Sequence, residues 1–245
     1  MDLEIVTLAE RPDLMDVFWD METSWPEFMK HDPIGNSYYS CIEECFRDYV
    51  LMALDGTGRI VAKAFSAPFH LPEGDLPDAG WDFALRNALL IRIWDETPNA
   101  VTAAEICVEP AVQGTGLSSL MVDALRDNAG RLGFSELIAP VRPNGRTDVH
   151  EPMAAYAFRT RDDGLPVDPW LRVHVRAGGR IDRVATRSMC IPGTVEEWRE
   201  WTGLPFDTTG PVEVPGALVP VMCDAEHGTA TYVEPNVWVR HATGV

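Results

Sequence analysis

The stretch Ile106-Cys-Val-Glu-Pro-Ala-Val-Gln-Gly-Thr-Gly-Leu-Ser-Ser-Leu-Met121 is the most informative part of the sequence. We expect a strand that ends at residues 108–110, followed by a short loop at residues 113–116 that opens a helix. The two glycines of the loop allow the backbone to approach a ligand and to point successive N–H groups outward. With the positive end of the helix dipole, these groups would form a pyrophosphate cradle. The alternative is a plain β–α turn in which glycine relieves crowding.

This stretch resembles the signature of the GCN5-related N-acetyltransferase (GNAT) family, in which a Gln/Arg-x-x-Gly-x-Gly/Ala loop follows the fourth strand. Here the loop reads Gln113-Gly-Thr-Gly116-Leu-Ser118, and Ser118 replaces the usual glycine or alanine with another small residue. The resemblance implies bound acetyl-CoA or coenzyme A, with the loop amides on the pyrophosphate and the pantetheine along the strand. The implied cofactor-binding residues are Ile106, Cys107, Val108, Gln113, Gly114, Thr115, Gly116, Leu117 and Ser118.

The order of the predicted elements also resembles this family. Apolar periodicity and turn signals predict a strand at 3–8, helices at 11–28 and 38–49, a hairpin at 49–54 and 59–65, a helix at 81–94, a strand at 102–108, a helix at 117–133 and a strand at 136–141. The last two strands are expected at 180–191 and 232–240, with a short helix at 194–201 between them.

The predicted fold class is α/β (α+β): a GNAT-like mixed, mostly antiparallel central sheet flanked by helices. We expect residues 1–245 to form a single domain, because no repeat or low-complexity linker divides the chain. Residues 142–167 would be an insertion before the fourth core helix, and residues 203–235 an extended C-terminal loop region.

The family's second element is a helix that often carries a tyrosine, which protonates the leaving thiolate. One placement uses Tyr156, and the other uses residues 168–179, with His174 where the tyrosine would stand. Apolar and polar residues alternate in the middle of the second stretch, as is typical of a strand. Its flanks favour a helix, because Asp168 suits the N-cap and Pro169 the first helical position.

Acyl transfer from a thioester to an amine needs a neutral amine, a stabilised carbonyl oxygen and a protonated leaving thiolate. By the resemblance, the backbone N–H of Val108 is the oxyanion donor. Glu105 is the candidate general base, and an exposed strand residue is the alternative. His174 is the candidate acid, because a free imidazole has a pKa of about 6.5; Tyr156 is the fallback, and a structural histidine is the alternative for His174. We interpret Cys107 as a buried strand thiol rather than a nucleophile.

The charge of the chain excludes some partners. Its 20 Lys+Arg face 38 Asp+Glu, a formal net charge of −18, which disfavours nucleic acid and anionic membrane surfaces. Residues 1–110 carry a net charge of −14, against −4 for residues 111–245. The first helices commonly border the acceptor site in the resembled family, so this asymmetry predicts a cationic amine acceptor.

Other sequence features are less specific. No apolar run is long enough to span a membrane, no signal peptide is visible and the five cysteines are scattered, so we expect a cytoplasmic protein with reduced thiols. The histidine spacing indicates no metal site, and the oligomeric state stays open, a homodimer included. Four tryptophans are candidates to line an acceptor pocket: Trp25, Trp81, Trp94 and Trp170. Two arginines could reach the 3′-phosphate of coenzyme A or be solvated loop residues: Arg142 and Arg146.

The leading hypothesis is an acyl-CoA-dependent N-acyltransferase, most simply an N-acetyltransferase, that acts on a small cationic amine. The first alternative is S-acyl transfer or thioester decarboxylation on the same scaffold in a biosynthetic pathway. The second is a non-catalytic acyl-CoA-binding module, and the third is a loop that binds another phosphate ligand.

Overall fold

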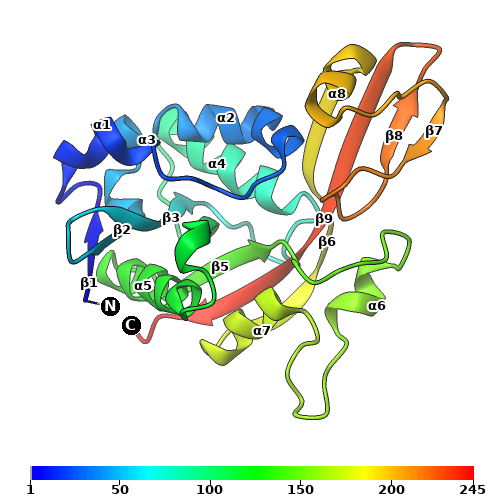
Figure 1. Ribbon diagram of the computed structural model, residues 1–245. Helices are drawn as coiled ribbons and strands as arrows, with labels where there is room; N and C mark the ends of the chain where they lie inside the picture. Colours follow the sequence, from blue (N-terminus) through cyan, green and yellow to red (C-terminus); the bar gives the residue numbers. More distant parts are fainter. Residues whose placement is uncertain (1) are drawn as a thin grey trace.

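A single mixed sheet of nine strands runs through the computed structural model, which describes residues 2–245 (Figure 1). The strands follow the order β1-β2-β3-β4-β5-β9-β8-β7, and β6 pairs with β9. Among the strands of residues 2–245 only β4 and β5 pair in parallel, so the prediction of a mixed, mostly antiparallel sheet is confirmed. The strands are β1 (Leu3–Thr7), β2 (Val50–Asp55), β3 (Ile60–Phe69), β4 (Ala100–Val108), β5 (Glu136–Val141), β6 (Arg180–Thr194), β7 (Gly210–Val212), β8 (Val221–Asp224) and β9 (Thr229–Ala242).

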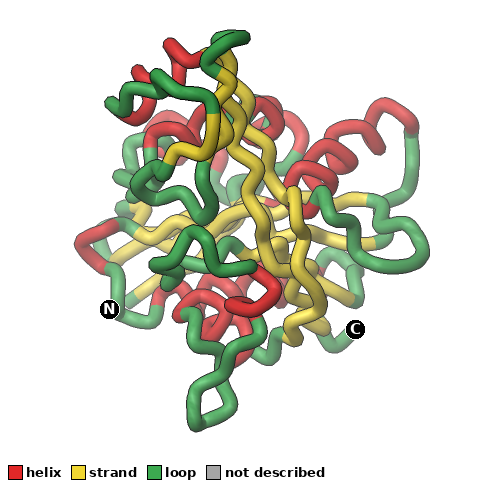
Figure 2. Tube along the Cα trace, turned by 90° about the vertical axis from the view of Figure 1, so that its right-hand side faces the viewer, coloured by secondary structure: helices red, strands yellow, loops and turns green. Residues whose placement is uncertain are grey.

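Helices cover both faces of the sheet (Figures 1 and 2). On one face α4 (Gly80–Trp94) packs on β3 and β6, and on the other α5 (Leu117–Arg131) packs on β3, β4 and β5. The apolar residues of α5 recur at helical spacing and are buried against the sheet, as an amphipathic helix requires. The remaining helices are η1 (Pro12–Leu14), α1 (Met15–Phe18), η2 (Glu27–His31), α2 (Pro33–Tyr39), α3 (Ile42–Cys45), η3 (Arg47–Tyr49), η4 (Pro110–Val112), α6 (Met153–Ala157), α7 (Pro169–Arg176) and α8 (Val195–Thr202).

The parallel strands β4 and β5 are joined over a short stretch. Their register pairs Val101 with Leu137 and Thr102 with Ile138, and includes no other pair within residues 2–245. Beyond these pairs β4 continues to Val108 along β3, while β5 continues along β9. The two strands therefore diverge, and the sheet opens in its middle at the end of β4 that leads into α5.

The N-terminal helices differ from the prediction. The single helix expected at residues 11–28 is wrong, because η1 and α1 end at Phe18 and η2 follows only after an irregular segment. The helix expected at 38–49 is also wrong, because α2 ends at Tyr39 and two separate turns follow. Cys41 and Phe46 leave helical backbone geometry between these turns, and Phe46 is fully buried. Tertiary packing of the aromatic side chains thus outweighs the helical spacing.

The elements around the second half of the chain follow the prediction more closely. The stretch in question at residues 168–179 is a helix, and Asp168 caps it by accepting hydrogen bonds from the amides of Trp170 and Leu171, both at 2.9 Å. The expected helix at 194–201 is α8, which begins with a Thr194–Glu197 capping box.

The description of residues 203–235 as a loop region is wrong in part. This segment contains β7, β8 and the first residues of β9, and with α8 it forms a lobe at the end of the long β6 and β9 strands (Figure 1). In β8, Val221 and Cys223 are buried while Met222 between them is exposed. That two-residue period is the pattern of a strand with one covered face.

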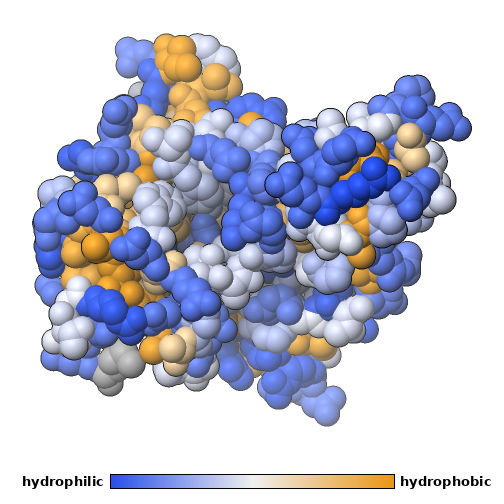
Figure 3. Space-filling view, turned by 45° about the horizontal axis from the view of Figure 1, so that its top comes forward, coloured by the Kyte–Doolittle hydropathy of each residue, from blue (hydrophilic) through white to orange (hydrophobic). Residues whose placement is uncertain are grey.

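The described helices and surface also bear on membranes. No helix within residues 2–245 is long and apolar enough to cross a membrane. Figure 3 shows hydrophilic side chains over most of the face that it presents, with hydrophobic groups in separate patches. This distribution agrees with the acidic composition of the chain.

Candidate active site

The loop before α5 presents unused backbone donors. Gly114 and Gly116 have φ angles of +77° and +89°, and a side chain at either would point into open space. Both angles lie in the left-handed region that favours glycine. Five consecutive amides have no hydrogen-bond acceptor within residues 2–245, namely those of Gly114, Thr115, Gly116, Leu117 and Ser118. Together with the N-terminus of the 15-residue α5, they fit the oxygens of a pyrophosphate.

The end of β4 offers further backbone donors. The Glu109 amide donates to Val61 of β3 at 3.0 Å. Because successive amides of a strand point to opposite sides, the Val108 amide faces away from β3, into the opening toward β5. The Gln113 side chain spans the loop and donates to the Val108 carbonyl at 3.1 Å. This edge can therefore hydrogen-bond an extended ligand, and the Val108 amide can donate to a carbonyl oxygen.

A cleft of about 840 Å³ occupies the opening between β4 and β5. It extends from the loop before α5 to the N-terminal helices, and its walls come from α2, β3, α4 and α7. Six of the nine predicted cofactor-binding residues line it: Ile106, Cys107, Val108, Gln113, Gly114 and Ser118. Thr115, Gly116 and Leu117 are absent from its lining.

Glu105 lies on the wall of this cleft at the centre of a hydrogen-bonded cluster. Its carboxylate accepts hydrogen bonds from the Trp25 indole and the Tyr39 hydroxyl. The thiol of Cys107 donates to the same carboxylate at 2.6 Å. Within residues 2–245 no lysine, arginine or histidine forms an ion pair with Glu105. The carboxylate is therefore oriented by three neutral donors.

Lys63 stands beside this cluster, opposite Cys107 in the register of β3 and β4. It is buried, lines the cleft, and its Nζ donates to the Phe18 carbonyl at 3.0 Å. Burial lowers the pKa of the Lys63 ammonium and raises that of the Cys107 thiol. Cys107 is thus a protonated buried thiol, in agreement with its interpretation as structural.

His174 also lines the cleft, from α7. Its Nδ1 lies 3.0 Å from Nε2 of His241, and both rings are buried. Burial, and secondarily His241, lowers the pKa of His174 to about 3, well below the 6.5 of a free imidazole. The ring is therefore neutral near pH 7. It can donate a hydrogen bond through an N–H, but it supplies no imidazolium.

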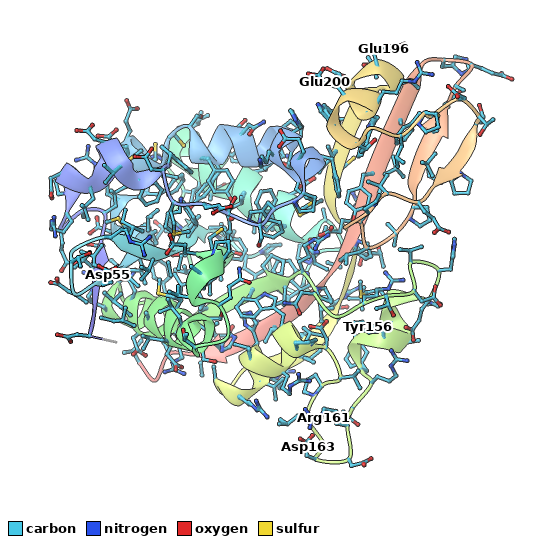
Figure 4. The ribbon with its side chains drawn as sticks, viewed as in Figure 1. Asp55, Tyr156, Arg161, Asp163, Glu196 and Glu200 are labelled. Carbon is cyan, nitrogen blue, oxygen red and sulfur yellow. The ribbon has the colours of Figure 1, made fainter. Side chains whose placement is uncertain are left out.

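Tyr156 lies on α6, at the side of the molecule away from β1 and β2 (Figure 4). Its hydroxyl donates to Asp168 Oδ2 at 2.9 Å, and it is absent from the residues that line the cleft. Asp168 Oδ2 also accepts from the amides of Asn144 and Gly145. Tyr156 thus ties the 142–167 segment to the N-terminus of α7.

Some of the remaining candidate tryptophans and arginines line the cleft, and others do not. Trp25, Trp81 and Trp170 line the cleft, whereas Trp94 is 57% exposed at the end of α4. Arg142 forms an ion pair with the buried Glu234 at 2.8 Å and lies on the cleft wall, so it is neither solvated nor free. Arg146 donates to backbone carbonyls of its own segment and of Leu218.

Known proteins resemble this chain in sequence and in fold. An arginine N-acetyltransferase, avaD of Aspergillus versicolor, is 34% identical to it over 96% of this chain and 92% of that protein. The loading GNATL domain of CurA from Lyngbya majuscula matches with a TM-score of 0.60 and 15% identity, over 99% of this chain and 97% of that domain. A GphF GNAT-like decarboxylase in complex with isobutyryl-CoA matches with a TM-score of 0.57 and 17% identity, over 99% and 100%. No family model matches the chain.

The chain belongs to the GCN5-related N-acetyltransferase family, as its sequence motif predicted. It is an acetyl-CoA-dependent N-acetyltransferase, and the predicted enzyme class and cofactor are confirmed. The unused amides of the loop and of β4 agree with this cofactor, since they match an anionic pyrophosphate followed by an extended chain with amide groups.

Proposed function

We propose that this enzyme transfers the acetyl group to a small cationic amine, with Glu105 as the general base. The observation that carries the proposal is the Glu105 carboxylate, which lies in the cleft and forms no ion pair within residues 2–245. A carboxylate held in this way attracts an ammonium ion and can accept its proton, either directly or through water. The relative avaD is named for acetylation of arginine, a cationic substrate, which supports the same acceptor class here.

The backbone at the end of β4 completes the proposed site. Acetyl-CoA supplies an activated thioester, and we assign its pyrophosphate to the amides of residues 114–118 and its pantetheine to the edge at Ile106 and Val108. The Val108 amide would donate to the carbonyl oxygen, where negative charge develops during attack. His174 would donate its N–H to the departing sulfur. Tyr156 remains the alternative donor, although it lies outside the cleft lining.

A steady-state assay tests this proposal. Purified protein is given acetyl-CoA and a panel of amines with zero, one and two positive charges, and thiol release and acetylated product are both measured. We expect acetylation of cationic amines, and a Glu105→Gln variant with kcat lowered about 100- to 10,000-fold. The matched control is Glu44→Gln on the exposed side of α3, with unchanged kcat. Full activity of Glu105→Gln would instead favour S-acyl transfer or decarboxylation, which need no amine-deprotonating base.

A further inference from the structure

Asp32 is a buried carboxylate on the wall of the same cleft, and one of its two oxygens has no hydrogen-bond partner within residues 2–245. The side chain is 2% exposed, and Oδ1 caps α2 by accepting from the amides of Ile34 and Gly35 at 2.9 and 2.8 Å. Oδ2 is buried and accepts no hydrogen bond within residues 2–245. Leaving a buried carboxylate oxygen unpaired costs free energy, which a bound donor would offset.

A second carboxylate lies close to Asp32. Asp82, in the first turn of α4, is 5% exposed; its Oδ2 accepts from the Cys190 amide at 3.1 Å, and its Oδ1 has no partner within residues 2–245. Neither aspartate forms an ion pair in that part of the chain. Nearby charges are Glu234, already paired with Arg142, and the exposed Arg86. Burial raises the pKa of Asp82 to about 8, so near pH 7 Asp82 keeps its proton and Asp32 is the carboxylate at this end of the cleft that lacks an ion-pair partner within residues 2–245.

The position of Asp32 relative to Glu105 follows from α2. Tyr39, whose hydroxyl donates to Glu105, stands seven residues after Asp32 on this helix. Seven residues of α-helix span about 10 Å. Tyr39, Asn36 and Trp81 line the cleft along this distance. Trp81 packs directly on α2, since a Cβ at Gly35 would lie 3.0 Å from its ring. An aromatic wall of this kind suits a cation or an aliphatic chain.

We propose that Asp32 binds a second cationic group of the acceptor, a guanidinium or ammonium, while the reacting amine lies at Glu105. The enzyme then selects dicationic acceptors, such as basic amino acids or diamines, over monoamines. A guanidinium suits Asp32 Oδ2 because it donates several hydrogen bonds in one plane. The inference rests on the proposed function. It adds a binding site for the second cationic group of the acceptor, and this site determines which amine of the acceptor is acetylated.

The test compares arginine with citrulline, which has nearly the same shape but no charge on its side chain. In the wild type we expect kcat/KM for arginine to exceed that for citrulline at least 100-fold, with the acetyl group on the α-amine by mass spectrometry. Asp32→Asn should remove most of this preference, through KM, because asparagine still caps a helix but carries no charge. KM for acetyl-CoA should not change. The control Asp48→Asn changes an exposed aspartate outside the cleft lining.

Calorimetric titration of arginine and citrulline into CoA-loaded protein separates this inference from the proposed function. If the wild type acetylates neither compound but binds arginine more tightly, and Asp32→Asn abolishes that difference, the subsite stands and the proposed function fails. If Asp32→Asn keeps the full preference for arginine in turnover and in binding, the subsite is overturned while the proposed function stands. Acetylation of a guanidine nitrogen would also overturn it, as would equal binding of the two compounds to the wild type.

Discussion

The Tyr39 hydroxyl donates a hydrogen bond to the Glu105 carboxylate, although 66 residues separate the two in the chain. Burial and the negative charge of Glu105 raise the pKa of Tyr39 well above its usual value, so the phenol stays protonated and remains a donor. A general base must point at its proton to act on it. Tyr39 therefore positions Glu105 rather than exchanging protons itself.

The first prediction is that Tyr39→Phe lowers kcat between about 10- and 100-fold, because a misdirected catalytic group loses activity steeply. The matched control is Tyr38→Phe on the same helix. Tyr38 is fully buried, whereas Tyr39 is partly buried, and Tyr38 donates to the Ser66 carbonyl at 2.8 Å rather than to Glu105. Both variants should lose about 1 kcal/mol of unfolding free energy. Equal kcat values for the two variants would contradict the positioning role.

The second prediction concerns the loop before α5. Gly116→Trp should raise KM for acetyl-CoA at least about tenfold, because a hydrogen bond to a charged group contributes about 1.5–3 kcal/mol. Gly133→Trp is its control, since Gly133 follows the same helix at φ +88° and also faces open space. The backbone strain is then the same in both variants. A Gly116→Trp protein that binds CoA as well as the Gly133→Trp protein does would rule out the cradle.

The third prediction separates the two candidate proton donors. Tyr156→Phe should keep kcat within about twofold and lower the unfolding free energy by about 1 kcal/mol, because it removes only the hydrogen bond to Asp168. His174→Leu should lower kcat, since it removes a hydrogen-bond donor from the cleft. Stopped-flow measurement of the chemical step, with urea unfolding in parallel, reports both effects. A 100-fold loss in Tyr156→Phe would reverse the assignment.

The fourth prediction is a pH dependence of stability that comes from Asp82. Burial, and secondarily the charge of Asp32, raises the pKa of Asp82 to about 8 from its ordinary 3.8. Between these values the folded protein keeps a proton that the unfolded chain releases, so this stabilising contribution is full below about pH 4 and falls as pH rises to about 8. Glu234 adds to the shift, and the Cys190 amide and Arg86 oppose it.

Urea unfolding at several pH values checks this dependence. Asp82→Asn cannot release a proton, so the variant should gain stability relative to the wild type as pH rises from 4 to 8. The difference between the two proteins isolates Asp82 from other titrating groups, including His174, whose lowered pKa acts in the opposite direction. A difference that stays constant across the window would show that Asp82 titrates normally.

The cofactor half of the site could be predicted from sequence because it is local. The strand, the glycine loop and the helix that follow one another from Ile106 to Arg131 determine both the geometry and the unused amides. The helix at 168–179 was predictable for the same reason, since two adjacent residues mark its start: Asp168 as the N-cap and Pro169 at the first helical position.

The acceptor half could not be predicted in this way. Asp32 and Tyr39 come to the cleft through short helices whose breaks depend on buried aromatic residues, and the sequence spacing favoured longer helices instead. The Asp32-Pro33 pair does mark the start of a helix, but no feature of the neighbouring sequence predicts that Oδ2 of Asp32 remains without a hydrogen-bond partner. The sequence around Lys63 does not predict that this lysine is buried, because its burial follows from the packing of Phe18 and Trp19 around it.

The short register of β4 and β5 has a consequence for the behaviour of the protein in solution. Two strands that part within a sheet expose backbone donors and acceptors, and such edges normally recruit strands from other chains and cause aggregation. Here the exposed edge faces an interior cleft of about 840 Å³, walled by helices. A slender ligand can extend along it, while a folded neighbour is excluded by size. The protein thus keeps a reactive edge for its cofactor without offering it to other polypeptides.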